Sequence, residues 1–365
     1  MTRKKTLVFH IGDHKTGSTS IQQAFALNKV TLTGRTLFYP GRQAHNHLGA
    51  AFRAQAKPKP KAAHEKALKS ITNIANRLRK SDADVCLISA ESFEQVKPQA
   101  FHDILTRHFA DICDDIRVVA YVRPHSARIL SSFAERIKIG SSQALNGTPE
   151  TFFTESQKAE RFHYGPRFSA WRDLFGESFI LRPMIGDQLH QGSVVSDFVR
   201  YGLGQEDFQL APLERSNQSL CLEDLMRLKL LHSCFTDHPH KLTHSLGWEM
   251  SRLLDSLPPL QVRTKLRLDK GLARDVHAAY LADARAMDRE FFGQTPLLET
   301  ELTKAIDTAG ETAQSLDPSD WLDPGEVRSL SLMAQLVAGM TEKNPGKWAA
   351  FWRAKYLDEL HQGGS

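Results

Sequence analysis

The sequence predicts an α/β fold in which a central, mostly parallel sheet of about five strands lies between layers of helices, followed by a helical C-terminal part. Short stretches rich in β-branched and apolar residues alternate with helical patterns over residues 1–205. Strands that alternate with helices form βαβ units, so their sheet is parallel and covered on both faces. After that point the strand patterns stop. We therefore predict an α/β core at 1–205 and a helical cap or subdomain at 206–365.

Each predicted strand is a short apolar run with the composition of a buried parallel strand. These runs are TLVFHI (6–11), TLFYP (36–40), DVCLISA (84–90), IRVVAYV (116–122) and SFILRPM (178–184). Helical patterns separate them at 18–29, in a stretch ending near Lys80, and at 98–109, 124–138 and 161–175; three more follow at 220–235, 272–292 and 326–340. The segment 56–62, AKPKPKA, is expected to be a flexible connection, because its prolines prevent a helix and its lysines favour solvent.

Composition limits the classes of function. With 365 residues, of which 41% are hydrophobic, the chain can bury a large core. A net charge of +5 is small for this length and favours a small anionic ligand over nucleic acid. No apolar run approaches the roughly 18 residues of a membrane span, and no secretory signal is apparent. The four cysteines show no C-x-x-C spacing. A cytoplasmic protein is expected.

The stretch HIGDHKTGSTSIQ (10–22) has the frame of a phosphate-binding P-loop. Four residues separate Gly12 from Gly17, and a strand precedes the loop while a helix follows it. Backbone N–H groups at such a helix start bind anions, and the helix dipole favours negative charge there. In a nucleoside triphosphatase, however, a lysine would follow the second glycine. Here Ser18 holds that position and Lys15 lies inside the loop, so the sequence predicts a P-loop-like fold with an unusual phosphate ligand.

A second strand, turn and helix lies in YVRPHSARILSSF, where Arg123 ends the strand and Ser131 lies about two turns into the helix. An arginine at a strand end can bind a phosphate bidentately, and a hydroxyl from the next helix can converge on the same group. These two residues are therefore candidates for a second phosphate site.

Together, HIGDHKTGSTSIQ, LISAESF, YVRPHSARILSSF and ERSNQSL resemble the bacterial members of the sulfotransferases that use 3′-phosphoadenosine 5′-phosphosulfate (PAPS). The resemblance covers roughly residues 6–220. It implies that PAPS is the co-substrate, that no metal is required, and that the acceptor is a hydroxyl or amine on a carbohydrate or glycolipid. The loop residues expected to hold the 5′-phosphosulfate are His14, Lys15, Thr16, Gly17, Ser18, Thr19 and Ser20.

Lys15 would approach the oxygen that bridges phosphate and sulfate, where it can stabilise charge on the leaving phosphate. Arg123 and Ser131 would hold the 3′-phosphate. Transfer also needs a base for the acceptor's proton. His45 and His47 follow the second predicted strand and Glu91 follows the third. His47 is the favoured base because a neutral imidazole titrates near physiological pH, and Glu91 is the alternative.

The resemblance is incomplete after the second motif. The family's late R-K-G-x-x-G loop is represented only by LDKGLAR around Gly271, so RSNQSL is the candidate equivalent, through Arg215, Asn217 and Ser219. The adenine-stacking aromatic is not identified. Tyr164 and Trp171 are close in sequence, although helical spacing favours core packing for Trp171.

The sequence leaves three other interpretations of the function open. A P-loop kinase or NTPase would need a lysine at position 18 and a strand-end aspartate for magnesium. A non-catalytic nucleotide-binding relative would keep the loop without turnover. A metal site is suggested by HSCFTDHPHKLTH, which holds His232, Cys234, Asp237, His238, His240 and His244, but the spacings match no zinc pattern. The acceptor and the oligomeric state are not predicted.

Overall fold

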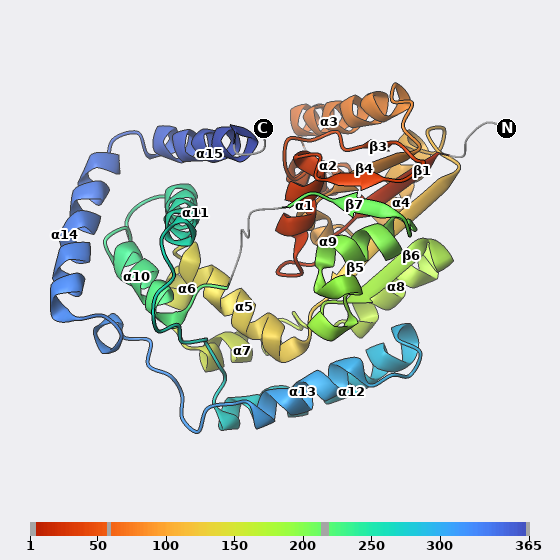
Figure 1. Cartoon of the computed structure of the whole chain (residues 1–365). Helices are drawn as coiled ribbons and strands as arrows, with labels where there is room; N and C mark the ends of the chain where they lie inside the picture. The colour runs from red at the N-terminus through yellow and green to blue at the C-terminus, as the bar shows by residue number, and fades with distance from the viewer. Residues whose placement is uncertain (1–4, 57–59, 213–218, 363–365) are drawn as a thin grey trace. The chain divides into compact units, whose positions relative to one another are not determined.

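The computed structural model describes residues 5–56, 60–212 and 219–362, and it confirms the α/β class with a helical C-terminal part (Figure 1). The described residues belong to two compact units. The first is drawn from Met1–Pro124 and Tyr164–Glu214, and the second from His125–His163 and Arg215–Ser365. The helices between residues 125 and 163 therefore belong to the same compact unit as the C-terminal helices. The sequence-based division at residue 205 stays a prediction.

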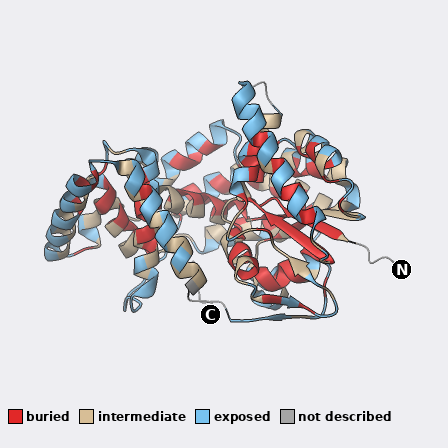
Figure 2. Cartoon of the chain, turned by 90° about the horizontal axis from the view of Figure 1, so that it is seen from above, coloured by how far each residue is buried: buried red, intermediate tan, exposed pale blue. Residues whose placement is uncertain are grey.

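The first unit contains a five-stranded sheet in the order β3-β4-β1-β5-β6, and every pairing in it is parallel. The strands are β1 (Thr6–His10), β3 (Leu37–Phe38), β4 (Val85–Ser89), β5 (Asp115–Val122) and β6 (Phe179–Pro183). All five predicted strands are confirmed. The central strands β1 and β4 are buried along their whole length, and the strands at the centre of the sheet are coloured as buried in Figure 2. Burial on both faces explains why they are uninterrupted apolar runs.

Helices cover both faces of the sheet. Successive side chains of a strand point to opposite faces, so Val8 and Phe9 pack into the core on opposite faces of the sheet. Val8 belongs to a cluster with residues of α1 (Ser18–Ala26) and α9 (Val194–Asp197). Phe9 instead packs edge to face against Phe101 and Phe109, with ring centroids 5.3 and 5.5 Å apart. The resulting arrangement is the predicted three layers of helix, sheet and helix.

Three further helices of this unit lie close to their predicted positions: α3 (Lys61–Arg79), α4 (Pro98–His108) and α8 (Gly165–Phe175). The helix α2 (Asn46–Gln55) and the 3₁₀ turn η1 (Glu91–Gln95) were not among the predicted helical patterns. The segment 56–62 connects α2 to α3, but α3 already begins at Lys61, so the last two residues of the segment are helical. Residues 57–59 fall outside the described residues. A second, two-stranded antiparallel sheet pairs β2 (Val30–Leu32) with β7 (Phe208–Leu210), and the sequence did not predict it.

The second unit is helical throughout its described elements. Its α-helices are α5 (His125–Lys138), α6 (Ser142–Leu145), α7 (Pro149–Lys158), α10 (Leu222–Ser233), α11 (His240–Ser256), α12 (Lys270–Phe291), α13 (Leu297–Asp307), α14 (Pro324–Thr341) and α15 (Pro345–Gln362), and the 3₁₀ helix η6 (Pro318–Asp320) precedes α14. The three predicted C-terminal helical patterns correspond to α10, α12 and α14. Within the described residues, no helix combines the length and the apolar composition needed to span a membrane.

Candidate functional site

The candidate site is built on the loop that connects β1 to α1 at the carboxyl end of the sheet. Three of its residues have positive φ: Gly12 at 70°, Lys15 at 66° and Gly17 at 79°. Glycine adopts this left-handed conformation without steric cost, whereas a side-chain-bearing residue such as Lys15 is strained in it. Strain of this kind concentrates at functional sites, where the surrounding structure imposes it.

Both glycines are also required by close packing. A Cβ atom on Gly12 would lie 2.8 Å from the Cα of Glu91, so the loop touches the backbone that follows β4. A Cβ atom on Gly17 would lie 2.9 Å from a methyl carbon of Val194 in α9. The loop is therefore clamped between two elements that are distant in sequence.

The start of α1 has the properties of an anion-binding helix terminus. No side chain caps it, and its first turn contains no acidic residue. Ser18 is 1% exposed, and its hydroxyl has no hydrogen-bond partner in the part of the chain that the structure describes. Thr16 is buried and donates its hydroxyl to the carbonyl of Asp13 at 2.5 Å, while Thr19 and Ser20 are half-buried. Free N–H groups at a helix start and an unused hydroxyl are suited to an oxyanion.

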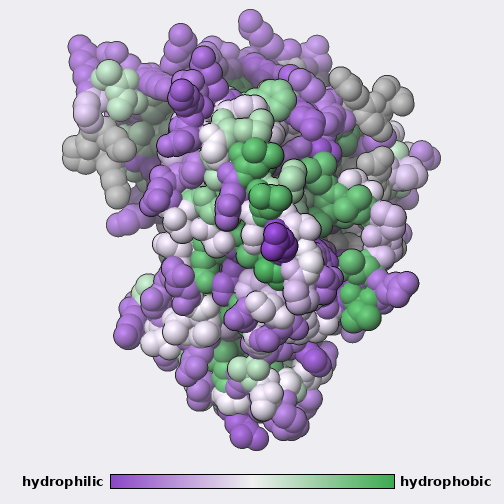
Figure 3. Space-filling model, turned by 90° about the vertical axis from the view of Figure 1, so that its left-hand side faces the viewer, coloured by the Kyte–Doolittle hydropathy of each residue, from purple (hydrophilic) through white to green (hydrophobic). Residues whose placement is uncertain are grey.

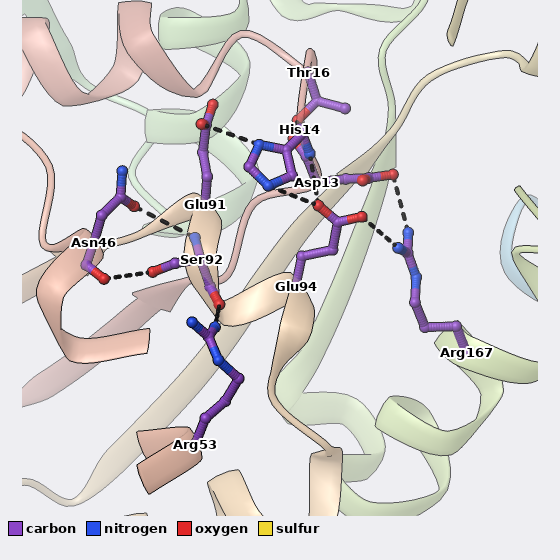
Figure 4. A network of polar contacts seen from close by, with 9 residues as sticks. All are labelled: Asp13, His14, Thr16, Asn46, Arg53, Glu91, Ser92, Glu94 and Arg167. Atoms are coloured by element: carbon purple, nitrogen blue, oxygen red, sulfur yellow. Dashed lines mark hydrogen bonds and ion pairs between the residues drawn. The ribbon is translucent and has the colours of Figure 1, made fainter. Parts of the chain in front are cut away.

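His14 connects the loop to η1 (Figure 4). Its Nδ1 lies 3.4 Å from a carboxylate oxygen of Glu91, and its Nε2 lies 3.3 Å from a carboxylate oxygen of Glu94. The same oxygen of Glu94 accepts a hydrogen bond from the backbone N–H of His14 at 3.2 Å. The structure thus brings the predicted residues His14 and Glu91 into direct contact.

Arg167 of α8 fastens the other side of the loop, as Figure 4 shows. It donates to Asp13 at 2.9 Å and to Glu94 at 3.1 Å. Asp13 is only 1% exposed, and this arginine compensates the charge of its buried carboxylate. Burial alone would lower the pKa of Arg167, but the charges of Asp13 and Glu94 outweigh it and raise the pKa above its usual value.

Glu91 is held as a carboxylate. Its burial would raise the pKa, but the hydrogen bond from His14, with the charges of His14 and Lys15, outweighs burial and lowers it. A lowered pKa makes Glu91 ionised at neutral pH and a weak proton acceptor. Because the charge of Lys15 contributes to this lowering, the carboxylate of Glu91 lies within electrostatic reach of that lysine.

Arg123 lies at the carboxyl end of β5, as predicted, and its guanidinium donates to the backbone carbonyl of Lys15 at 2.9 Å. The carbonyl of Arg123 in turn accepts a hydrogen bond from the buried hydroxyl of Tyr164 at 2.9 Å. The structure thus joins the two predicted phosphate motifs at Lys15 and Arg123. Ser131 lies in α5 of the second unit, where it is half-buried.

His47 is an exposed residue in the first turn of α2. Desolvation lowers its pKa, which keeps its imidazole neutral at physiological pH. The start of α2 is tied to η1, because the hydroxyl of Ser92 donates to the carbonyl of Asn46 at 2.8 Å. Gly49 lets the two elements approach, since a Cβ atom there would lie 2.1 Å from the hydroxyl oxygen of Ser92. The two candidate bases, His47 and Glu91, therefore lie on elements that contact each other.

Two histidines are buried behind the loop. His10 Nδ1 lies 2.8 Å from the hydroxyl of Ser89, and His45 Nδ1 accepts a hydrogen bond from the backbone N–H of Ser89 at 3.2 Å. Burial lowers the pKa of each imidazole to about 4. His45, considered beside His47 as a base, is 1% exposed, so it is a core residue in this structure.

The other sequence-based candidates are placed as follows. Trp171 is 2% exposed and packs against Phe101 and Phe179, which confirms core packing for it. Ser219 is exposed in the second unit, whereas Arg215 and Asn217 lie outside the described residues.

The histidine-rich segment spans the end of α10 and the start of α11, as its proline predicts. His232 is buried against the carbonyl of Lys138, at 2.9 Å. Within the described ranges, no group of three histidine, cysteine or acidic side chains is arranged to hold a metal ion.

The sequence reasoning missed the anchoring network of Asp13, Glu94 and Arg167. One signal was available: Asp13 is an acidic residue within a loop predicted to bind an anion, and such a residue needs a nearby cation. No spacing rule could have identified that cation as Arg167, which lies 154 residues further along the chain.

No protein-family model, no curated protein and no solved structure matches this chain.

Proposed function

We propose that this protein is a sulfotransferase that transfers the sulfuryl group of PAPS to a hydroxyl or amine acceptor. The observation that carries the proposal is the position of Lys15. It lies inside the glycine loop, in a strained left-handed conformation, with Arg123 bonded to its carbonyl and Glu91 within electrostatic reach. A lysine at this point suits a ligand whose leaving group is a nucleotide phosphate, as the resemblance to PAPS-dependent enzymes implies.

The donor fits the residues of the loop. The uncapped start of α1, with no acidic residue in its first turn, would hold the 5′-phosphate through backbone N–H groups. The buried hydroxyl of Ser18 has no partner among the described residues and would donate to the same phosphate. Arg167 compensates Asp13 and Glu94, which lowers the repulsion that these carboxylates would exert on an anionic ligand.

In the proposed reaction the acceptor oxygen or nitrogen attacks sulfur, and the bond from sulfur to the bridging oxygen breaks. The electron pair of that bond stays on the 5′-phosphate of 3′-phosphoadenosine 5′-phosphate (PAP), where Lys15 stabilises the developing charge. The acceptor's proton passes to a base. His47 stays the favoured base: it is exposed and neutral, whereas Glu91 is paired with His14 and has a lowered pKa. The acceptor class, a carbohydrate or glycolipid, rests on the resemblance alone.

Calorimetric binding of PAP, ATP and adenosine 5′-phosphosulfate, each with and without Mg²⁺, tests the donor. We expect PAP to bind most tightly, and without magnesium. Lys15→Ala should reduce turnover by about 100-fold or more through loss of charge stabilisation, while the exposed Lys69→Ala in α3 serves as the matched control. Tighter binding of ATP with Mg²⁺ would instead support a nucleotide kinase or NTPase.

Arg123 requires a sharper test because it contacts the loop itself. If it binds the 3′-phosphate, Arg123→Ala should weaken PAP binding by about 10- to 100-fold, the usual range for a bond between charged groups, and leave AMP binding nearly unchanged. If it only holds the carbonyl of Lys15, both ligands should lose affinity equally. Equal losses would contradict its assignment to the 3′-phosphate.

The base is tested by comparing His47→Ala with Glu91→Gln. We expect His47→Ala to lose turnover while it still binds PAP. Full turnover in His47→Ala, together with loss of turnover and intact PAP binding in Glu91→Gln, would identify Glu91 as the base instead of His47. PAP binding without transfer to any acceptor offered would favour the non-catalytic relative.

A further inference from the structure

Helix α14 (Pro324–Thr341) places its small residues inward and its large apolar residues outward. Its buried positions are Ala334, Ala338 and Thr341. Ala334 and Ala338 join the core cluster of the second unit, which includes residues of α10 and α11. Four large apolar side chains are exposed instead: Leu332 at 67%, Met333 at 55%, Leu336 at 57% and Met340 at 59%. Single exposed apolar residues are ordinary, but a contiguous group of this kind marks an interaction surface.

The four side chains form one stripe. At 100° per residue, Leu332, Leu336 and Met340 follow each other at intervals of four residues, and Met333 lies beside them. The stripe faces almost directly away from Ala334, Ala338 and Thr341. Figure 3 looks onto the side of the molecule that carries α14 and shows hydrophobic side chains gathered there among hydrophilic ones. A helix with apolar residues on two opposite sides is expected to be covered on both.

The charges of α14 indicate that a protein, and not a lipid surface, binds the exposed stripe. Residues 329–341 contain no charged residue. Over 324–347 the positive residues Arg328, Lys343 and Lys347 nearly balance the negative residues Glu326 and Glu342, which leaves a net charge of +1. Helices that lie on membranes usually carry several basic residues on their polar face, and this one does not.

The ends of the stripe are complementary to each other. Arg328 is exposed before it and Glu342 is exposed after it, and neither forms an ion pair within the described ranges. If two copies of α14 pair antiparallel around Leu336, Leu332 of each lies opposite Met340 of the other. Arg328 then lies about 3 Å along the helix axis from Glu342 of the other copy, on the same flank. The small residue Gly339 lies on the stripe and permits a close approach of the helices.

From this pattern we propose that the exposed stripe of α14, comprising Leu332, Met333, Leu336 and Met340, is the contact through which two copies of this chain pair antiparallel. The interface is isologous: Leu336 packs on its own counterpart at the two-fold axis, and the ion pair between Arg328 and Glu342 forms twice. Apolar burial supplies most of the affinity, and the two ion pairs set the antiparallel orientation.

Sedimentation velocity over a range of protein concentrations tests the proposal. We expect a concentration-dependent dimer whose dissociation constant rises at least about tenfold in Leu336→Glu, because a charge would be buried at the axis. Leu257→Glu is the matched control, since Leu257 is 60% exposed in the same unit but lies after α11 and outside the stripe. Circular dichroism and thermal unfolding of each variant establish that it is folded.

Charge reversal tests the orientation. Arg328→Glu or Glu342→Arg alone should weaken the dimer by about threefold to tenfold, and the double variant should restore it, because both ion pairs re-form with opposite sign. Oxidative cross-linking adds a second readout. Leu336→Cys should form a disulfide-linked dimer, whereas Leu257→Cys and Leu332→Cys should not, because only position 336 meets itself in the antiparallel pair.

A protein that stays monomeric at about 100 μM and shows no cross-link through Leu336→Cys would overturn the proposal. So would a monomer that floats with phosphatidylcholine or phosphatidylglycerol vesicles in a manner that depends on Leu336. A dimer that is unaffected by Leu336→Glu would place the interface elsewhere and would contradict it equally.

Discussion

Replacement of Arg167 with methionine should destabilise the first unit by about 3 kcal/mol, the low end of the range for breaking a buried ion pair. The reason is Asp13, which is 1% exposed and would lose the guanidinium 2.9 Å away. Glu94 would lose its bond at the same time. Methionine keeps much of the apolar length of arginine, so the decrease in the free energy of unfolding arises mainly from the lost ion pairs. Urea unfolding at pH 7, followed by circular dichroism, measures the change in the free energy of unfolding.

A double-mutant cycle separates this cause from lost packing. Asp13→Asn removes the buried charge, so Arg167→Met should cost less in the Asp13→Asn background than in the native chain, by about 2 kcal/mol. PAP binding gives a second readout, because a loosened loop should bind more weakly in Arg167→Met and partly recover in the double variant. If the two substitutions are additive, or if Arg167→Met costs less than about 1 kcal/mol, the anchoring role assigned to Arg167 is refuted.

Two further predictions concern the loop glycine and the buried histidines. Gly17→Ala should lower the free energy of unfolding by about 2 kcal/mol or more, because of its positive φ and the contact of the new methyl group with Val194. The control Gly34→Ala, with φ 71° and open space around it, should lower it by only about 1 kcal/mol. Equal losses of the two variants in thermal or urea unfolding would contradict a steric clash with Val194. His10 and His45 have folded pKa values of about 4, below the value of about 6.5 expected in the unfolded chain, so the unfolded state binds more protons between these values. The stability they contribute is therefore complete above about pH 6.5 and lost as the pH falls towards 4, by about 3 kcal/mol for each histidine. His45→Gln should flatten this pH profile and the exposed His64→Gln should not; a profile that His45→Gln leaves unchanged would count against the assignment.

The elements that the sequence predicted well are those whose pattern is local. Strands such as β1 are mostly apolar because both of their faces are buried, so their burial can be predicted without knowledge of the neighbouring strands. The pair β2 and β7 was not predicted, because each strand has three residues and Val30 pairs with Leu210, 180 positions away. Short strands of this kind depend on a partner that local pattern does not reveal.

The same distinction applies to the candidate site. The glycine loop and the strand-end position of Arg123 follow from local sequence, and the structure confirms both placements. The bond from Arg123 to the carbonyl of Lys15 and the pairing of Arg167 with Asp13 arise from docking of distant elements. In α14 the helical pattern was recognised, but the pattern alone could not show that the small residues face inward.

The path of the chain through the first unit has a consequence for its synthesis. Residues 125–163 belong to the second unit and are made before α8 and β6, which complete the first. A nascent chain that has reached Pro124 carries the whole glycine loop but lacks Arg167, so the bonds from this guanidinium to Asp13 and Glu94 cannot yet form. We therefore expect the loop to acquire its ligand-binding geometry only late in translation. A fragment ending at Pro124 would contain the motif without its affinity.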